Sequence, residues 1–292
     1  MDSFADKVAV VTGAGDGMGR SLAMQLATAG CHVALCDVLD DKLADTVERV
    51  SAAAPGVRVT GHKCDVSDEF QWHQLRDDVM KQHQTDHVHL LFNNAGIAGS
   101  GSMVVDERDA WERTFNVCWG GVYLGTRTFL PLLIEAPEAH LINTSSVNGF
   151  WASLGPDTSH TAYSAAKFAV KGFTEALITD LAINAPHVGV SVVMPGHIGT
   201  GIAENSVVVH GGETDPAVTE MAATFRNSAP MTADEAATVI LDGVRENRWR
   251  ILVGDDAHVL DVAVRTDPEE AYDRDFRERL GRHLQPLLDD TP

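Results

Sequence analysis

The sequence predicts an α/β protein in which helices cover both faces of a doubly wound parallel sheet. Short apolar runs alternate strictly with longer segments of helical pattern, an order that builds parallel strands joined by crossover helices. A glycine-rich turn follows the first apolar run, and polar residues follow several later runs. Because ligands bind beyond the carboxyl ends of such strands, these turns are expected to converge on one site.

The expected elements alternate along most of the chain. Strands are expected near residues 7–12, 32–37, 57–62, 88–93, 139–145, 188–194 and 249–253. Helices are expected near residues 17–29, 40–54, 68–84, 106–135, 160–185 and 232–247. No repeat or linker interrupts this order, so we expect a single domain over residues 1–292, with a core of about 5–253 and a C-terminal helical extension of about 255–292.

The first turn has the composition of a phosphate-binding loop. Four glycines stand close together after the first strand, at Gly13, Gly15, Gly17 and Gly19. Glycines permit positive φ and let backbone N–H groups approach a pyrophosphate, whose charge is favoured at a helix N-terminus. The literal G-x-G-x-x-G spacing fails, because Met18 occupies the last glycine position. A structural turn alone accounts for one or two glycines, so the pattern Thr-Gly-x-x-x-Gly-x-Gly favours a cofactor site.

Asp37 ends the second expected strand, 20 residues after Gly17. A carboxylate at this place accepts hydrogen bonds from the adenosine ribose hydroxyls and repels a 2′-phosphate. No Arg or Lys occupies positions 38–41, and the glycine-rich turn carries Asp16. The sequence therefore predicts NAD rather than NADP. The alternative, a helix N-cap aspartate, fits Asp40 better than Asp37.

Tyr163 and Lys167 stand four residues apart, on one face of an expected helix. Tyr has an ordinary pKa of about 10, and a neighbouring ammonium favours the phenolate. Lowering the pKa by roughly 3 units needs about 4 kcal/mol, which one close and partly desolvated cation could largely supply. Such a phenol could take a proton from an alcohol while a hydride leaves its carbon. The alternative is an ordinary contact on a helix surface, so the pair by itself is only suggestive.

The chain resembles the short-chain dehydrogenase/reductase family, of the single-domain Rossmann-like type, over about residues 5–253. The motifs that carry the resemblance occur in the family's order: Thr12-Gly13 to Gly19, Asp65-Val66, Asn93-Asn94-Ala95-Gly96, Asn116, Ser145-Ser146, Tyr163 with Lys167, and Pro195-Gly196 with Thr200. Each motif is modest alone, but their common order is specific. The resemblance implies an NAD(H)-dependent oxidoreductase that interconverts a secondary alcohol and a ketone.

By this resemblance the catalytic residues are Asn116, Ser146, Tyr163 and Lys167. Tyr163 would be the general base in oxidation and the acid in reduction, and Lys167 would lower its pKa and bind the nicotinamide ribose. Ser146 would hydrogen-bond the reacting oxygen, and Asn116 would fix a water that links Lys167 to solvent. The family's serine could be Ser145, although the pattern Asn-x-Ser-Ser-x-x-Gly favours Ser146.

The resemblance also assigns residues to the cofactor NAD. Asp65 and Val66 are expected to meet the adenine, residues 93–96 to support the sheet and the ribose, and the segment 195–200 to hold the nicotinamide carboxamide. The expected cofactor residues are Gly13, Asp16, Gly17, Met18, Gly19, Asp37, Asp65, Val66, Asn93, Ala95, Gly96, Tyr163, Lys167, Pro195, Ile198 and Thr200.

The sequence identifies the substrate-binding residues less clearly than the cofactor-binding residues. The interval of 17 residues from Ser146 to Tyr163 is longer than is usual in the family, and the surplus lies around residues 154–158. The Gly/Ser/Thr-rich stretch of about 200–230 is expected to be the substrate loop. Ser146, Phe150, Trp151 and Tyr163 are the expected substrate residues, with Ile97 and His197 as further pocket candidates. Their apolar bias favours a lipophilic alcohol, cyclic or aromatic.

The tail carries an apolar stripe at nearly every fourth position, typical of one helix face. Its members are Tyr272, Phe276, Leu280, Leu284, Leu287 and Leu288. By resemblance, the protein forms a homodimer or homotetramer through the helices near 106–135 and 160–185. The tail could pack on that assembly or fold over the substrate loop, and its position after the last strand favours the loop.

Composition narrows the partners to small molecules. A formal charge of −20 argues against nucleic acid and against an anionic membrane. No signal peptide or membrane-spanning run is evident, and the four cysteines have the pattern of core residues in a reducing compartment, so we expect a cytoplasmic protein. His83, His87 and His89 are interpreted as solvated surface residues, and no metal site is expected.

A different class of function is a catalytically silent protein that binds NAD in a regulatory or scaffold role. The complete set of Asn, Ser, Tyr and Lys counts against it, because a silent protein has no need of the acid and base groups. Loss of NADH absorbance on addition of a ketone would distinguish the two.

Overall fold

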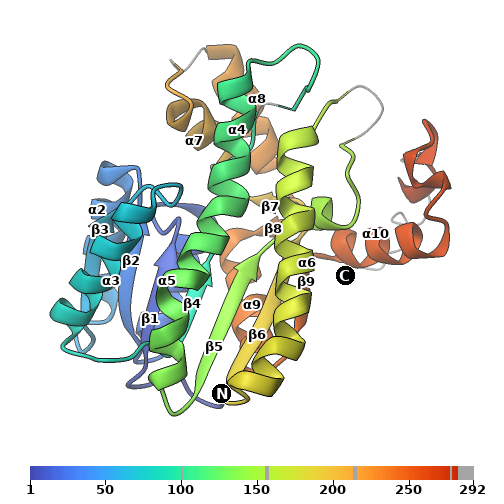
Figure 1. Ribbon diagram of the computed structural model, residues 1–292. Coiled ribbons are helices and arrows are strands. Elements are labelled where there is room, and N and C mark those ends of the chain that lie inside the picture. Colours follow the sequence, from blue (N-terminus) through green and yellow to red (C-terminus); the bar gives the residue numbers. More distant parts are fainter. Residues whose placement is uncertain (100, 155–157, 213–215, 277, 282–292) are drawn as a thin grey trace, which may run out of the picture.

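A seven-stranded parallel sheet organises the protein, and helices lie on both of its faces (Figure 1). The computed structural model describes residues 1–292 except 100, 155–157, 213–215, 277 and 282–292. The strand order is β3-β2-β1-β4-β5-β6-β9. The strands are β1 (Val8–Thr12), β2 (His32–Asp37), β3 (Val59–Lys63), β4 (Leu90–Asn93), β5 (Ala139–Thr144), β6 (Val188–Pro195) and β9 (Arg250–Val253). The expected strands and fold class are confirmed.

Side chains along each strand alternate between two hydrophobic clusters, one on each face of the sheet. In β1, Ala9 and Val11 join the first cluster, while Val8 and Val10 join the second. The first face is covered by α1 (Gly17–Thr28), α2 (Asp40–Ala53) and α9 (Ala233–Arg245). The second face is covered by α3 (Glu69–His83), α5 (Gly121–Glu135) and α6 (Thr161–Asn184). Burial on both faces is why the strands read as continuous apolar runs.

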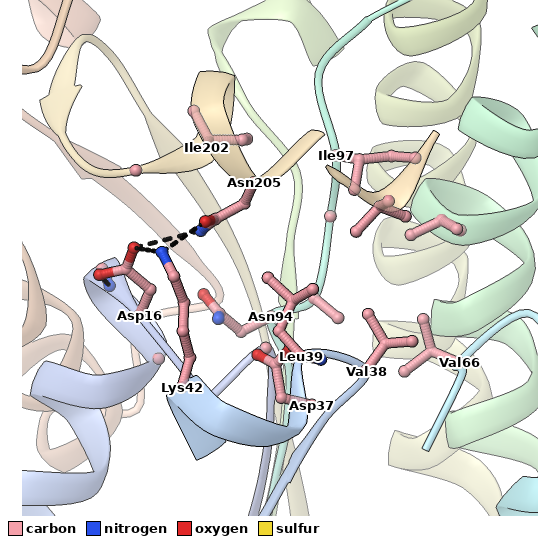
Figure 2. Close-up of a pocket in the computed structure, with 18 of the residues that line it drawn as sticks. Asp16, Asp37, Val38, Leu39, Lys42, Val66, Asn94, Ile97, Ile202 and Asn205 are labelled. Atoms are coloured by element: carbon pink, nitrogen blue, oxygen red, sulfur yellow. Dashed lines mark hydrogen bonds and ion pairs between the residues drawn. The ribbon is translucent and has the colours of Figure 1, made fainter. Parts of the chain in front are cut away.

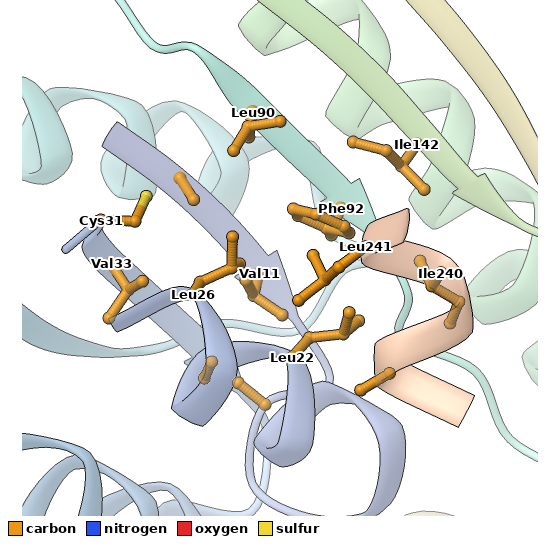
Figure 3. Close-up of a cluster of buried hydrophobic side chains, with 14 of the residues drawn as sticks. Val11, Leu22, Leu26, Cys31, Val33, Leu90, Phe92, Ile142, Ile240 and Leu241 are labelled. Atoms are coloured by element: carbon orange, nitrogen blue, oxygen red, sulfur yellow. The ribbon is translucent and has the colours of Figure 1, made fainter. Parts of the chain in front are cut away.

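The first cluster holds the glycine-rich turn in place. Leu22 and Leu26 of α1 pack against Val11 of β1 and Phe92 of β4, with Leu241 of α9 beside them (Figure 3). All five side chains are at most 1% exposed. Each such side chain contributes roughly 1.5–3 kcal/mol by its burial. The start of α1 is therefore fixed against the ends of β1 and β4.

The helix expected near 106–135 is one rod with a π-helical turn in its middle. α4 (Arg108–Phe115) passes through the turn Asn116–Gly120 into α5, and the N–H of Gly121 donates to the carbonyl of Asn116. By length and composition this rod is long and apolar enough to cross a membrane, whereas the sequence analysis expected no membrane-spanning run. However, 56% of its apolar window is buried inside the structure, as in the core helix of a soluble protein.

The stretch expected as the substrate loop contains two helices, α7 (Ile202–Val209) and α8 (Pro216–Asn227). It is closed at its base by a small parallel pair of strands, β7 (Ile198–Gly199) and β8 (Met231–Thr232), in which Ile198 lies opposite Met231. In Figure 1, both helices lie beyond the carboxyl ends of the large sheet. The segment is thus positioned over the edge where the site was expected.

The described part of the tail packs on the segment after β5, not on the substrate loop as the sequence analysis expected. α10 (Asp255–Thr266) is followed by a 3₁₀ turn at Glu270–Tyr272. In the described part of the tail, Leu260, Val264 and Phe276 are buried around Trp151, and no member of this cluster comes from residues 201–229. The large indole ring supplies the apolar surface that the stripe needs, and its N–H donates to the carbonyl of Ala271 at 2.7 Å. Leu284, Leu287 and Leu288 lie outside the described residues.

All four cysteines are buried and unpaired, as expected. The interpretation of the histidines was wrong for His83 and His89, which are 6% and 7% exposed. His83 shares a hydrogen bond of 2.9 Å with the Thr60 hydroxyl, and Nδ1 of His89 accepts the Val8 N–H at 3.1 Å. These bonds satisfy polar atoms inside the fold. Among the described residues, no group of three or more His, Cys, Asp or Glu could hold a metal ion.

Candidate active site

The glycine-rich turn has a geometry that only glycine can provide. Gly13 and Gly17 have φ values of +64° and +52°. A Cβ on Gly19 would lie 2.0 Å from the carbonyl oxygen of Gly13, which leaves no room for a side chain. Asp16 caps α1 by accepting the Gly17 N–H at 2.8 Å. Backbone N–H groups at the start of α1 therefore face the space beyond β1.

Strand order reverses between β1 and β4, and the two strand ends separate there. The Thr12 hydroxyl holds the separation by accepting the N–H groups of Asn94 and Ala95 at 2.9 and 3.0 Å. The Asn94 side chain donates to the Thr12 carbonyl at 2.9 Å. Its Oδ1 is buried without a partner among the described residues. That oxygen could accept a hydrogen bond from a ligand hydroxyl.

A cavity of about 130 Å³, open in part to solvent, occupies this crevice (Figure 2). Most of the expected cofactor residues line it: Gly13, Asp16, Gly17, Met18, Gly19, Asp37, Asp65, Val66, Ala95, Gly96 and Thr200. The other expected cofactor residues do not line it: Asn93, Tyr163, Lys167, Pro195 and Ile198. Asn93 is buried in the sheet, where its side chain donates to Asn143 Oδ1 at 2.9 Å. Its expected support of the sheet is therefore seen, but a contact with the ribose is not.

Six further lining residues were not anticipated: Val38, Leu39, Lys42, Cys64, Arg113 and Val117. Four more come from the stretch expected as the substrate loop rather than as part of the cofactor site: Gly201, Ile202, Asn205 and Val209. Lys42 stands one position beyond the window that was searched for basic residues. A search extended through the first turn of α2 would have found it. Asn205 could not be found this way, because the loop that contains it carried no clear helical pattern.

The Asp37 carboxylate is held by two backbone N–H groups, from Gly15 at 2.8 Å and from Leu39 at 2.9 Å. Burial nonetheless raises the pKa of Asp37. The N-cap of α2 is Leu39, so the N-cap alternative for Asp40 was wrong. Asp40 lies within the first turn of that helix, where the positive end of the helix dipole stabilises its negative charge.

Asp65 borders the cavity at the side expected for the adenine. It forms an ion pair of 2.8 Å with Arg113 and accepts hydrogen bonds from Ser67. Burial acts to raise the pKa of Asp65, but the hydrogen bonds from Ser67 and Arg113 more than offset it, so the pKa is lowered. Asp65 is therefore a fixed carboxylate near neutral pH.

Tyr163 and Lys167 share one face of α6, and Lys167 Nζ lies 5.3 Å from the centroid of the Tyr163 ring. The ammonium donates to the Thr144 carbonyl at 2.9 Å. Burial raises the pKa of Tyr163, although a hydrogen bond from Ser146 acts in the opposite direction. Burial also lowers the pKa of Lys167. The expected lowering of the Tyr163 pKa is thus contradicted for the protein groups alone, because desolvation by burial outweighs the opposing effect of Ser146.

The structure distinguishes the two adjacent serines. The Ser146 hydroxyl lies close enough to Tyr163 to act on its pKa, and its Oγ accepts the Asn148 N–H at 3.1 Å. The Ser145 hydroxyl donates to the Lys167 carbonyl at 2.7 Å, which ties the end of β5 to α6. Ser146 is therefore the serine beside the phenol, and Ser145 has a structural position.

Asn116 stays a predicted relay residue. Its side chain is exposed, and among the described residues it forms no direct hydrogen bond with Lys167. Two positions on, Cys118 is fully buried and lies within electrostatic reach of both Tyr163 and Lys167. A Cβ on Gly96 would lie 3.4 Å from Lys167 Nζ and 3.7 Å from Cys118 Sγ. A π-helical turn begins at Asn116 inside the expected helix, and the sequence pattern did not predict this turn.

Phe150 and Trp151 are occupied by contacts within the protein. Trp151 is 6% exposed under the tail, and the Arg250 guanidinium lies 5.8 Å from the Phe150 ring. His160, which was not anticipated, lies next to Tyr163 with 4.7 Å between ring centroids. Burial lowers the pKa of His160 to about 4, so its ring is neutral at neutral pH. Its place three residues before the tyrosine was the only available signal.

Comparisons with known proteins agree with this arrangement. A family profile described as short chain dehydrogenase matches residues 7–208. SadH, a protein of Mycobacterium tuberculosis named as an oxidoreductase, is 39% identical over 266 residues, which make up 91% of this chain and 92% of that protein.

Two solved structures extend the comparison. A short-chain dehydrogenase/reductase from Burkholderia phymatum in complex with NAD has a TM-score of 0.83 and 33% identity, over 94% of this chain and 98% of the other. A metagenomic short-chain oxidoreductase in complex with NADP has a TM-score of 0.65 and 25% identity, over 85% of this chain and 97% of the other. Relatives of this fold thus bind either dinucleotide.

Proposed function

Because the chain belongs to the short-chain dehydrogenase family, we propose that it is an NAD(H)-dependent oxidoreductase that interconverts a secondary alcohol and a ketone. The observation that carries this proposal is the juxtaposition of three side chains: Ser146 lies within reach of Tyr163, and Lys167 shares the same face of α6 with Nζ 5.3 Å from the Tyr163 ring centroid. Gly96 connects this group to the dinucleotide cavity, because it lines the cavity and stands next to Lys167 Nζ.

The residues at the site have complementary roles in this proposal. In oxidation Tyr163 takes the proton of the alcohol, and in reduction it returns a proton to the carbonyl oxygen. Ser146 donates to the same oxygen and orients it, while Lys167 supplies a fixed positive charge. When bound, the nicotinamide cofactor accepts or supplies the hydride.

NAD is the proposed cofactor. The glycine-rich turn accommodates a pyrophosphate at the start of α1, and Asp37 supplies a buried acceptor at the adenosine end. The unpartnered Asn94 Oδ1 fits a ligand with hydroxyl groups. Lys42 borders the same cavity, so its charge weakens the repulsion of a 2′-phosphate without removing it.

A lipophilic alcohol, cyclic or aromatic, is the proposed substrate. The cavity is lined by apolar side chains that include Ile97, Val117 and Ile202. Such a surface favours a ligand that loses little hydration on binding. Screening a panel of secondary alcohols with NAD would test this proposal, and turnover confined to small polar alcohols would contradict it.

A homodimer or homotetramer is the proposed assembly, in the cytoplasm. Several apolar side chains on α5 and α6 are exposed: Tyr123, Phe168 and Ile183 are 44%, 42% and 72% exposed. These residues lie on the two helices expected to form the interface. Light scattering of the purified protein would show a monomer if the proposal is wrong.

The decisive experiment mixes the purified protein with NADH and a series of cyclic and aromatic ketones. We expect ketone-dependent loss of NADH absorbance, and the reverse reaction with NAD and the matching alcohol. Binding of NADH without turnover of any substrate by the wild type, alongside an active relative as a control, would favour a non-catalytic role.

A further inference from the structure

Three polar side chains from three elements meet at one side of the dinucleotide cavity (Figure 2). The Lys42 ammonium, on α2, donates to Asp16 Oδ2 at 2.9 Å and to Asn205 Oδ1 at 2.6 Å. The Asn205 side chain, on α7, donates to the same Asp16 oxygen at 3.2 Å. Each pair of the three residues is therefore joined directly. The cluster connects the glycine-rich turn to the helix that crosses the cavity.

Helix α7 has few other attachments to the body of the protein. Ser206 is its only buried residue. The Ser206 hydroxyl accepts the Ala98 N–H at 2.8 Å, on the side of the cavity formed by β4. Glu204 pairs with Arg226 of α8, which belongs to the same segment. Because α7 buries little apolar surface, polar contacts at its two sides decide its position.

Ile202 and Val209, one turn on either side of Asn205, also line the cavity. A dinucleotide in the cavity would therefore lie between α7 and the glycine-rich turn. To open this side, the chain must break the hydrogen bonds of Asn205 to Lys42 and Asp16. These bonds involve charged groups, which makes them stronger than bonds between neutral groups.

From this geometry we propose that Asp16, Lys42 and Asn205 form a polar latch that sets the rate at which the dinucleotide leaves. The inference rests on the proposed binding of NAD(H). Lys42 and Asn205 act as positioning residues: they hold α7 and take no part in the transfer of hydride or proton. Loss of either side chain frees α7 on this side and speeds release.

The test measures NADH release by mixing the NADH complex with excess NAD and following NADH fluorescence in a stopped-flow instrument. Asn205→Ala, which changes no charge, is expected to raise the release rate about tenfold, the effect of one hydrogen bond to a charged group. Lys42→Met should act similarly, and Lys42→Arg should retain slow release. The double variant Lys42→Met with Asn205→Ala should release NADH hardly faster than either single variant, because the contacts act as a unit.

Asn184→Ala and Lys81→Met are matched controls, since both residues are exposed on helices that do not line the cavity. Wild-type release rates in both Asn205→Ala and Lys42→Met, in protein that keeps its far-UV circular dichroism, would overturn the latch while leaving the proposed function intact. Failure of the wild type to bind NADH at all would overturn both proposals.

Discussion

The Asp37 carboxylate accepts a hydrogen bond of 2.8 Å from the backbone N–H of Gly15, which joins the end of β2 to the glycine-rich turn. Its other oxygen accepts the Leu39 N–H at 2.9 Å. Because the side chain is held by backbone on both sides, its charge has a fixed position in the cavity wall. Cofactor choice depends on that position.

We predict that kcat/KM with NAD exceeds that with NADP by at least about a hundredfold. A 2′-phosphate about 4 Å from Asp37 would meet a repulsion of about 4 kcal/mol per charge at an effective dielectric constant of 20, and Lys42 and salt reduce this value. Steady-state kinetics with both cofactors check the prediction. Equal efficiencies would show that Asp37 does not contact the ribose.

Tyr163→Phe is expected to lower kcat by at least about a hundredfold while NADH binding is kept, because the variant loses the group that transfers the proton. Fluorescence titration with NADH and turnover of the best substrate measure the two quantities. The phenyl ring preserves the packing of α6, so unfolding is not an expected explanation. A variant with near wild-type turnover would make the proposed mechanism wrong.

Asn116→Ala is expected to leave kcat within about threefold of the wild type, since the side chain is exposed and the change removes no buried hydrogen bond. The Tyr163→Phe variant, assayed in parallel, provides the scale for loss of a catalytic group. A comparable loss in Asn116→Ala would instead support the relay role that the resemblance implied.

The rate of oxidation is expected to rise with pH through the neutral range. Burial raises the pKa of Tyr163, so the phenol is protonated near pH 7, whereas oxidation requires the phenolate. Below that pKa, the phenolate fraction grows about tenfold per pH unit. Reduction uses the protonated form and should be nearly independent of pH over the same range. A profile of kcat/KM for the alcohol that falls between about pH 7 and 9 would contradict this assignment.

Phe276→Ala is expected to destabilise the protein by about 3 kcal/mol and to raise KM for the alcohol without changing the affinity for NADH. Phe276 is buried against Trp151, which follows Ser146 closely along the chain, so a looser cluster would misplace the substrate end of the site. Phe70→Ala is the control, because Phe70 is 68% exposed. If Phe276→Ala weakened NADH binding as much as it raised KM for the alcohol, the substitution would be disturbing the whole fold rather than the substrate end of the site.

Motifs that lie within one strand, turn or helix were predictable, because the conformation of each depends mainly on residues that are neighbours in the sequence. The glycine-rich turn, Asp37 and the Tyr163/Lys167 pair follow from strand and helix periodicity, and the structure brings most of the expected cofactor residues to one cavity. Asn116 shows the limit of this reasoning. A π-helical turn begins at this residue inside the expected helix, and residue types alone did not indicate where that turn begins.

The sequence by itself determined the alternation of strands and helices, the order of the motifs and the family. These features reside in short-range patterns of apolar and glycine residues. Tertiary structure decided the rest. Asn205 meets Lys42 across 163 positions of the chain, and Trp151 meets Ala271 across 120. The pKa of Tyr163 is raised because the folded chain removes water from around the phenol, and that desolvation is a property of the packed protein rather than of any motif.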